Sequence, residues 1–206
     1  MKRVLFLLSL FSAITCLGQT KEDLFYLIDK IPVDKAGNID FCITDSVSKT
    51  SHMSLYEKAV EAITYYFKET PPPSVPLGDK KGNTIIYRGK FGRYYRTGKV
   101  FSSTPHTYIY HFTLRIECIG NKYKIEINDI EESDNENNTT LKDMLDKSFY
   151  NNTRLASNSI KNRYDSIYFI YNYVNDKLRS ISNFMKAAEK KSGKYNKKKI
   201  VPAEQH

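Results

Sequence analysis

Residues 106–131 read HTYIYHFTLRIECIGNKYKIEINDIE, two alternating runs that meet at Gly120 and Asn121. Gly and Asn tolerate the positive φ of a tight hairpin turn, so Ile119 and Lys122 are expected to face each other. This register pairs apolar residues on one face and opposite charges on the other: Cys118 with Tyr123, Ile116 with Ile125, Leu114 with Ile127, Glu117 with Lys124 and Arg115 with Glu126. A slip of one residue would bury the charges, so turn and pattern predict one register.

Two further strands are predicted before the hairpin, over residues 39–47 and 84–95, because apolar and polar residues alternate there. Gly89 and Gly92 interrupt the second strand, which indicates a bulge or a sharp bend. Residues 129–138 are rich in Asp, Glu and Asn, and we expect them to form a solvated loop rather than a calcium site, since the EF-hand glycine and terminal glutamate are missing.

Helices are predicted at three places. The first begins at Ser54, whose side chain and that of Glu57 form a capping box, and ends before the prolines at 71–73. A short second helix is predicted over residues 141–149. The third occupies residues 160–188, where apolar residues recur at alternating steps of four and three. A turn of helix or a strand precedes Pro32.

The third helix is expected to be longer than the sheet. About 29 residues of helix span roughly 43 Å, whereas a seven-residue strand spans about 23 Å. Its C-terminal part would then present a candidate partner strip made of Leu178, Ile181, Met185 and Ala188. Core packing is the alternative. A third possibility is that the segment around Leu24, Phe25 and Ile28 covers the strip; the lysines beyond the strip favour such a monomer over a homodimer, because they would repel a parallel copy.

The N-terminus has the order of a secretory signal peptide. Lys2 and Arg3 precede an apolar run, and small residues lead to Gly18, after which we expect cleavage. Lipid anchoring at Cys16 is the alternative, although Thr15 stands where a small residue is expected. No other run reaches the roughly 18 apolar residues of a membrane-spanning helix. We therefore expect an exported periplasmic or extracellular protein that is not transmembrane.

The domain organisation follows from composition and charge. Residues 1–18 are the signal peptide, 19–191 a single domain with its core over 39–188, and 192–206 a basic tail expected to be disordered. Most of the formal net charge of +9 lies in the lysine-rich C-terminal segment and in the signal peptide. The basic tail is interpreted as a solubilising end, and a tether to an anionic surface is the alternative. Because exported proteins meet little nucleic acid, no nucleic-acid partner is expected.

Cys42 and Cys118 remain after removal of the signal peptide. The alternation places them on opposite faces of the sheet, so two free thiols are favoured over a disulfide, which needs a short Cβ separation.

The sequence contains no catalytic motif, no metal-ligand spacing around its histidines and no nucleotide-binding loop, so neither enzyme activity nor a cofactor is expected. One expected function is a non-catalytic binding or scaffold domain whose open sheet face meets a protein or glycan through Arg88, Lys90, His111, Thr113, Arg115 and Glu126. The alternative is a hydrolase of an envelope or dietary polymer, with Asp129 and Glu131 as candidates for an assembled carboxylate pair. A concave pocket around these two would favour the enzyme, and a solvated loop the binding domain.

The order of elements resembles a domain-of-unknown-function family described as having a TBP-like fold, found in exported proteins of Bacteroidota. The residues that carry the resemblance are Leu55 to Ala59, residues 83–90, residues 110–116 and residues 120–124. The resemblance implies an α+β fold: an antiparallel, mostly meander sheet with helices packed on one face and a long C-terminal helix. It implies no known activity, and similarity to the TATA-binding protein fold does not imply DNA binding.

Overall fold

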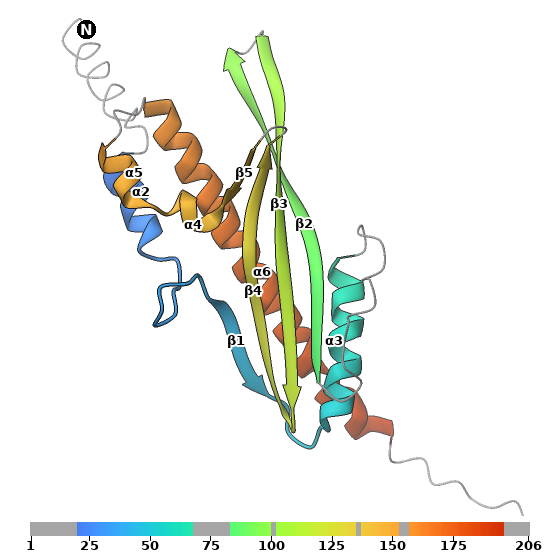
Figure 1. The fold of residues 1–206 in the computed structure, drawn as a ribbon. Coiled ribbons are helices and arrows are strands. Elements are labelled where there is room, and N and C mark those ends of the chain that lie inside the picture. The colour runs from blue at the N-terminus through green and yellow to red at the C-terminus, as the bar shows by residue number, and fades with distance from the viewer. Residues whose placement is uncertain (1–19, 68–82, 100–101, 135–136, 153–156, 196–206) are drawn as a thin grey trace, which may run out of the picture.

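The computed structural model describes residues 20–67, 83–99, 102–134, 137–152 and 157–195 (Figure 1). The helices are α2 (Lys21–Ile28), α3 (His52–Tyr66), α4 (Leu141–Met144), α5 (Lys147–Asn152) and α6 (Ser157–Tyr195). The strands are β1 (Phe41–Ser46), β2 (Thr84–Lys99), β3 (Ser102–Ile119), β4 (Lys122–Asp134) and β5 (Asn137–Thr140). The expected signal peptide and most of the expected tail lie outside the described residues. α6 continues to Tyr195, past residue 192 where the tail was expected to begin.

The five strands form one antiparallel sheet in the order β1-β4-β3-β2, with β5 paired to the far end of β4. The predicted hairpin register is confirmed, from Ile119 opposite Lys122 to Leu114 opposite Ile127. Gly120 has φ +62°, as the tight turn requires. The predicted charge pairs face each other, but their ion pairs run along each strand instead, joining Arg115 to Glu117 and Lys124 to Glu126.

The expected bulge at Gly89 or Gly92 is wrong, because β2 pairs with β3 without a register shift from Thr84 to Lys99. Gly89 is instead required by packing: a Cβ there would lie 2.4 Å from the ring of Phe112. The shift occurs in β4, where Asp129 and Ile130 together oppose Phe112.

This bulge also overturns the expected loop at residues 129–138. Asp129 takes the left-handed conformation with φ +50°, so that Asn128 and Asp129 both lie outward while Ile130 and Glu132 return to the buried face. Alternation therefore resumes, β4 continues to Asp134, and β5 pairs with it.

The helices begin and end differently from the sequence prediction. Ser51, not Ser54, is the N-cap of α3, and its hydroxyl accepts a hydrogen bond from the Ser54 amide at 3.2 Å. The segment before Pro32 forms α2, capped by Thr20. The predicted helix over 141–149 is divided into α4 and α5.

α6 and α3 pack against the buried face of the sheet, as predicted (Figure 1). Arg93 of β2 donates to Ser166 Oγ at 3.0 Å near the start of α6, and the Tyr123 hydroxyl of β4 lies 2.8 Å from Ser182 Oγ near its end. Between these contacts, the ring of Phe91 stacks on Tyr173. α6 therefore lies along the sheet over much of its length.

The expected partner strip is wrong, because Leu178, Ile181 and Met185 are each at most 1% exposed; the Ala188 side chain lies outside the described set. The strands are much longer than assumed: the 18 residues of β3 span roughly 60 Å, and the sheet still contacts α6 at Ser182, through Tyr123. α2 packs on α6, but at the opposite end of that helix from α3 (Figure 1). No helix in the described ranges is long and apolar enough to span a membrane.

Cys42 and Cys118 are free thiols on opposite faces of the sheet, Cys42 exposed and Cys118 buried. Burial raises the pKa of Cys118 to about 11. The pKa of Cys42 is raised mainly by partial burial and, to a smaller extent, by the nearby Asp40 carboxylate. We expect iodoacetamide at pH 8.5 to modify Cys42 in the native chain, and Cys118 only after unfolding, because access limits the buried thiol. Peptide mapping by mass spectrometry measures this, and equal modification of both in the native state would contradict the buried position of Cys118.

Candidate binding site on the open sheet face

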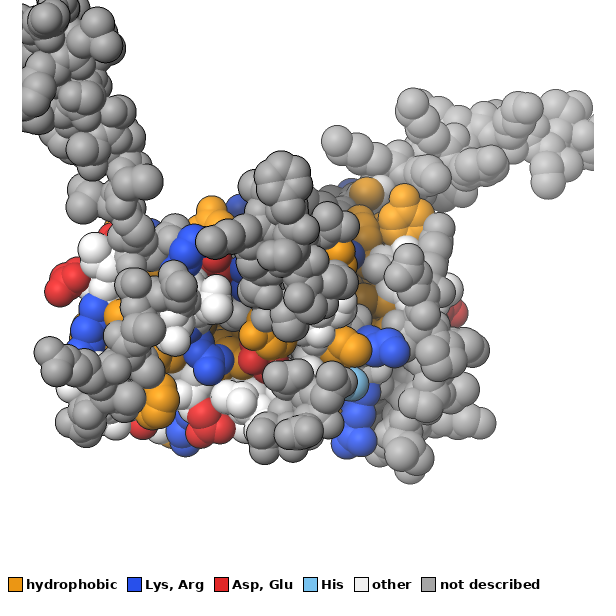
Figure 2. Space-filling view, turned by 90° about the horizontal axis from the view of Figure 1, so that it is seen from above, with side chains coloured by type: hydrophobic (Ala, Val, Ile, Leu, Met, Phe, Trp, Pro, Cys, Tyr) orange, Lys and Arg blue, Asp and Glu red, His pale blue; other side chains and the backbone are white. Residues whose placement is uncertain are grey.

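The six residues predicted for the open face all lie on the side of the sheet away from α3 and α6. Arg88, Lys90, His111 and Arg115 are exposed, and Thr113 and Glu126 are half-buried. These six side chains are basic, acidic, or polar and uncharged, and Figure 2, which looks along the strands, shows Lys, Arg, Asp and Glu side chains together at that end of the molecule. The face is therefore polar and mixed in charge.

Four of the six line one hollow of about 590 Å³, which we call the sheet hollow. The pairing of β2 with β3 places Arg88 opposite Thr113 and Lys90 opposite His111. The other lining residues are Gly89, Phe112, Asp129 and Glu131. Arg115 lies outside this hollow, in its ion pair with Glu117.

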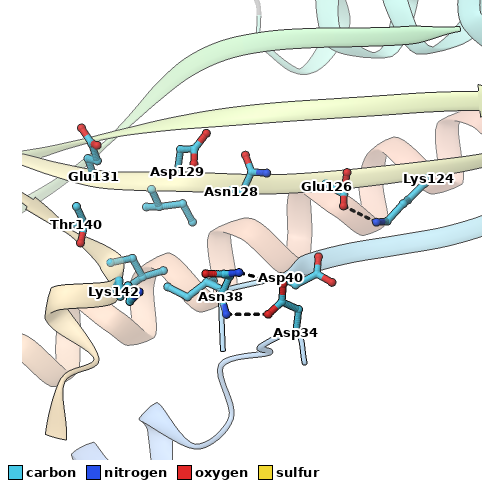
Figure 3. A pocket seen from close by; sticks show the side chains of 13 residues that line it. Asp34, Asn38, Asp40, Lys124, Glu126, Asn128, Asp129, Glu131, Thr140 and Lys142 are labelled. Carbon is cyan, nitrogen blue, oxygen red and sulfur yellow. Dashed lines mark hydrogen bonds and ion pairs between the residues drawn. The ribbon is translucent and has the colours of Figure 1, made fainter. Parts of the chain in front are cut away.

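A second hollow of about 760 Å³ lies at the outer edge of β4, and we call it the edge hollow (Figure 3). β1 pairs with β4 only as far as Ile127, and the pairing of β5 with β4 begins at Glu131 of β4. None of the described strands pairs with residues 128–130 on this edge. The hollow is lined by Asp34, Asn38, Ile39, Asp40, Lys124, Glu126, Asn128, Asp129, Ile130, Glu131, Thr140, Leu141 and Lys142.

A turn before β1 supplies one wall of the edge hollow. Asp34 Oδ1 accepts hydrogen bonds from the amides of Ala36 and Asn38, both at 2.8 Å. These bonds, led by the one from the Asn38 backbone, hold the pKa of Asp34 below its usual value. Asp34, Asn38 and Asp40 lie across the hollow from β4 in Figure 3, where Glu126 is paired with Lys124.

Sequence reasoning missed this wall, although Asp34, Gly37 and Asn38 are typical turn residues. It also missed Thr140 and Lys142, because the sequence predicts a loop at residues 129–138, and a loop gives no reason to expect the end of β5 beside β4. Asp129 and Glu131 do line concave surfaces, and they contribute to both hollows. Asp129 is nonetheless exposed.

A metal centre has no support in the described ranges, which contain no group of three His, Cys, Asp or Glu side chains placed to hold an ion. The polar groups that line the two hollows can form hydrogen bonds and ion pairs with a ligand. They are carboxylates, amides, threonine hydroxyls, lysines, an arginine and a histidine.

An antiparallel sheet with helices on one face and a long C-terminal helix defines this chain as an α+β protein with a TBP-like fold. Residues 44–133 match the model of the family described as "Domain of unknown function (DUF4468) with TBP-like fold", which confirms the resemblance over that part of the chain.

Two solved structures are similar in fold. One is a DUF4468 family protein from Bacteroides ovatus ATCC 8483, with a TM-score of 0.58 and 14% identity, covering 79% of this chain and 94% of that one. The other is a TBP-like protein from Parabacteroides distasonis ATCC 8503, with a TM-score of 0.51 and 17% identity, covering 74% of this chain and 97% of that one. No curated protein matches the chain.

Proposed function

We propose that the protein is a non-catalytic binding or scaffold domain, exported to the bacterial cell envelope, whose open sheet face binds a protein or glycan. The observation that carries the proposal is the sheet hollow, in which Arg88, Lys90, His111 and Thr113 converge. Its volume of about 590 Å³ lies within the range of roughly 300 to 1,000 Å³ usual for ligand pockets. Its polar groups are held on paired strands, which position side chains more rigidly than loops do.

The hydrolase is the second candidate, and one observation favours it: Asp129 and Glu131 line both hollows. A carboxylic acid that protonates a leaving group needs a raised pKa, which burial or a second nearby carboxylate provides. Asp129 is exposed and Glu131 is only half-buried, so neither has the apolar surroundings that such an acid requires. Binding is the better-supported function.

The binding function is tested by capturing envelope components with the full chain and comparing two charge-reversed forms. The double variant Arg88→Glu with Lys90→Glu is expected to retain the bound component at least tenfold less than the wild-type chain, because it reverses the sign of one wall of the sheet hollow. Lys122→Glu is the matched control, since this exposed lysine lies at the hairpin turn, outside the hollow. Equal retention by all three chains would refute the site.

Export is part of the proposal and has its own measurement. The mature product is expected to begin at Gln19 without a lipid, because Thr15 precedes Cys16 and Gly18 offers a small residue for cleavage. The intact mass of the protein isolated from its native host measures this. A diacylglyceryl group on Cys16 would instead establish a membrane-anchored lipoprotein.

A further inference from the structure

The two hollows meet at Asp129 and Glu131, which line both of them. The meeting point is created by the bulge, because the extra residue in β4 places Asn128 and Asp129 together on the open side. The two hollows therefore adjoin across β4.

The edge hollow has the composition of a site for a long cationic side chain. Ile39, Ile130 and Leu141 line it, and the half-buried Ile39 presents apolar surface, since Ile130 and Leu141 are almost fully buried. Five carboxylates also line it: Asp34, Asp40, Glu126, Asp129 and Glu131. Two lysines line it as well, Lys124, which is ion-paired with Glu126, and Lys142, so the acidic side chains outnumber the basic ones. Lysine and arginine carry an aliphatic stem with a charged end, so apolar surface beside carboxylates suits both parts of such a side chain.

Asn128 adds an acceptor to this hollow. Its side-chain oxygen is buried and has no hydrogen-bond partner among the described residues. A buried acceptor without a donor costs free energy, which an incoming N–H group would recover. Arginine offers five such donors in a planar arrangement that also fits carboxylates, whereas lysine offers three on a single point charge.

The wall of the sheet hollow that β2 and β3 form is basic, so it suits an acidic side chain of a ligand rather than a basic one. Arg88, Lys90 and His111 lie there on β2 and β3, and each can donate to a carboxylate. β2 and β4 are separated by two inter-strand spacings, roughly 10 Å, and the edge hollow lies further out. In an extended polypeptide, side chains four residues apart are separated by roughly 13 Å.

We propose that the two hollows together bind one extended polypeptide segment of a partner protein, with an arginine in the edge hollow and an acidic side chain about four residues away in the sheet hollow. The proposal deepens the proposed function and rests on it. An anionic polysaccharide fits less well, because it would bring negative charge against Asp40, Asp129 and Glu131.

The test is a titration of the isotope-labelled full chain with the acetylated and amidated peptide GRGSGEG, followed by amide NMR shifts. Saturable shifts are expected at residues 39–40, 128–131 and 140–142 and at Arg88, Lys90 and His111. The peptides GQGSGEG and GRGSGQG are expected to bind at least fivefold more weakly. Equal binding of the three peptides, or shifts confined to other surfaces, would overturn the inference.

A variant chain supplies the second readout. Asp129→Asn with Glu131→Gln is expected to weaken binding of GRGSGEG at least tenfold, and Asn tolerates the positive φ of residue 129 as Asp does. Glu117→Gln, on the same face but outside both hollows, is the control and is expected to bind as the wild type does. Unchanged thermal midpoints would show that both variants are folded, and Asp40→Asn replaces the double variant if it is not.

The experiments can disprove the binding function and the polypeptide inference independently of each other. If envelope capture depends on Arg88 and Lys90 while GRGSGEG causes no shift in the edge hollow, the binding function stands and the polypeptide inference is wrong. If capture is equal for all chains while the peptide binds as described, the two hollows are a polypeptide site but not the surface that retains the envelope component.

Discussion

Leu114→Ala is expected to lower the free energy of unfolding by about 2 to 5 kcal/mol, the usual range for removing a fully buried leucine side chain. Leu114 is fully buried between Tyr87 on β2 and Ile127 on β4, its partners in the sheet. The cavity would lie beneath the helix layer, where neighbouring rings limit collapse. The midpoint of denaturant unfolding measures this change, provided that the slope of the transition is the same for both chains.

The matched controls for Leu114 are its neighbours on the other face. Reversing the charge at Arg115 or at Glu117 individually is expected to cost under about 1 kcal/mol, because exposed ion pairs contribute only tenths of a kcal/mol. The Arg115 side chain is 46% exposed. Equal losses on both faces would mean that a second layer covers the supposedly open side, and the candidate binding site would then be buried.

Gly89→Ala is expected to cost about 1 to 3 kcal/mol, although it adds a single methyl group, because overpacking a filled core forces its neighbours to shift. The new Cβ would lie 2.4 Å from Phe112 Cζ and 2.6 Å from Tyr87 Cε1. Both rings are almost fully buried and pack against Phe67, so neither can rotate away without disturbing a third ring.

Gly92→Ala is the control for this substitution, three residues along the same strand. Its Cβ would meet nothing closer than 3.7 Å, and we expect a change within about 0.5 kcal/mol. Thermal or denaturant unfolding of both variants measures the two changes in the free energy of unfolding. If Gly89→Ala were as stable as Gly92→Ala, the ring positions of Tyr87 and Phe112 would be wrong.

The hairpin could be predicted because it depends on local information. The turn at Gly120 and Asn121 and the alternation on either side specify one register, and the structure has that register. The same alternation placed Arg88, Lys90, His111 and Thr113 on the open face, where they line one hollow. Residue spacing along a strand is enough to predict which face a side chain takes.

The edge hollow could not be predicted, because it depends on where three distant segments end. Along β4, the pairing with β1 stops at Ile127 and the pairing with β5 starts at Glu131, and the turn at Asp34 lies beside the gap between them. The bulge at Asp129 leaves a local signal, since the apolar residues Ile127 and Ile130 are three positions apart rather than two, but the sequence alone does not show that Phe112 of the partner strand faces two residues. The predicted overhang of α6 is wrong for a related reason: alternation alone predicts short strands, because it breaks at glycines that the sheet accommodates.

Labelling of His111 by diethylpyrocarbonate tests the central claim, that the open face binds the partner, most directly. His111 lies in the sheet hollow, and His52 lies at the start of α3; both are exposed. When the full chain holds its captured envelope component, labelling of His111 is expected to slow at least fivefold while labelling of His52 stays unchanged. Unchanged labelling of His111, or protection of His52 alone, would contradict the claim and place the binding surface elsewhere.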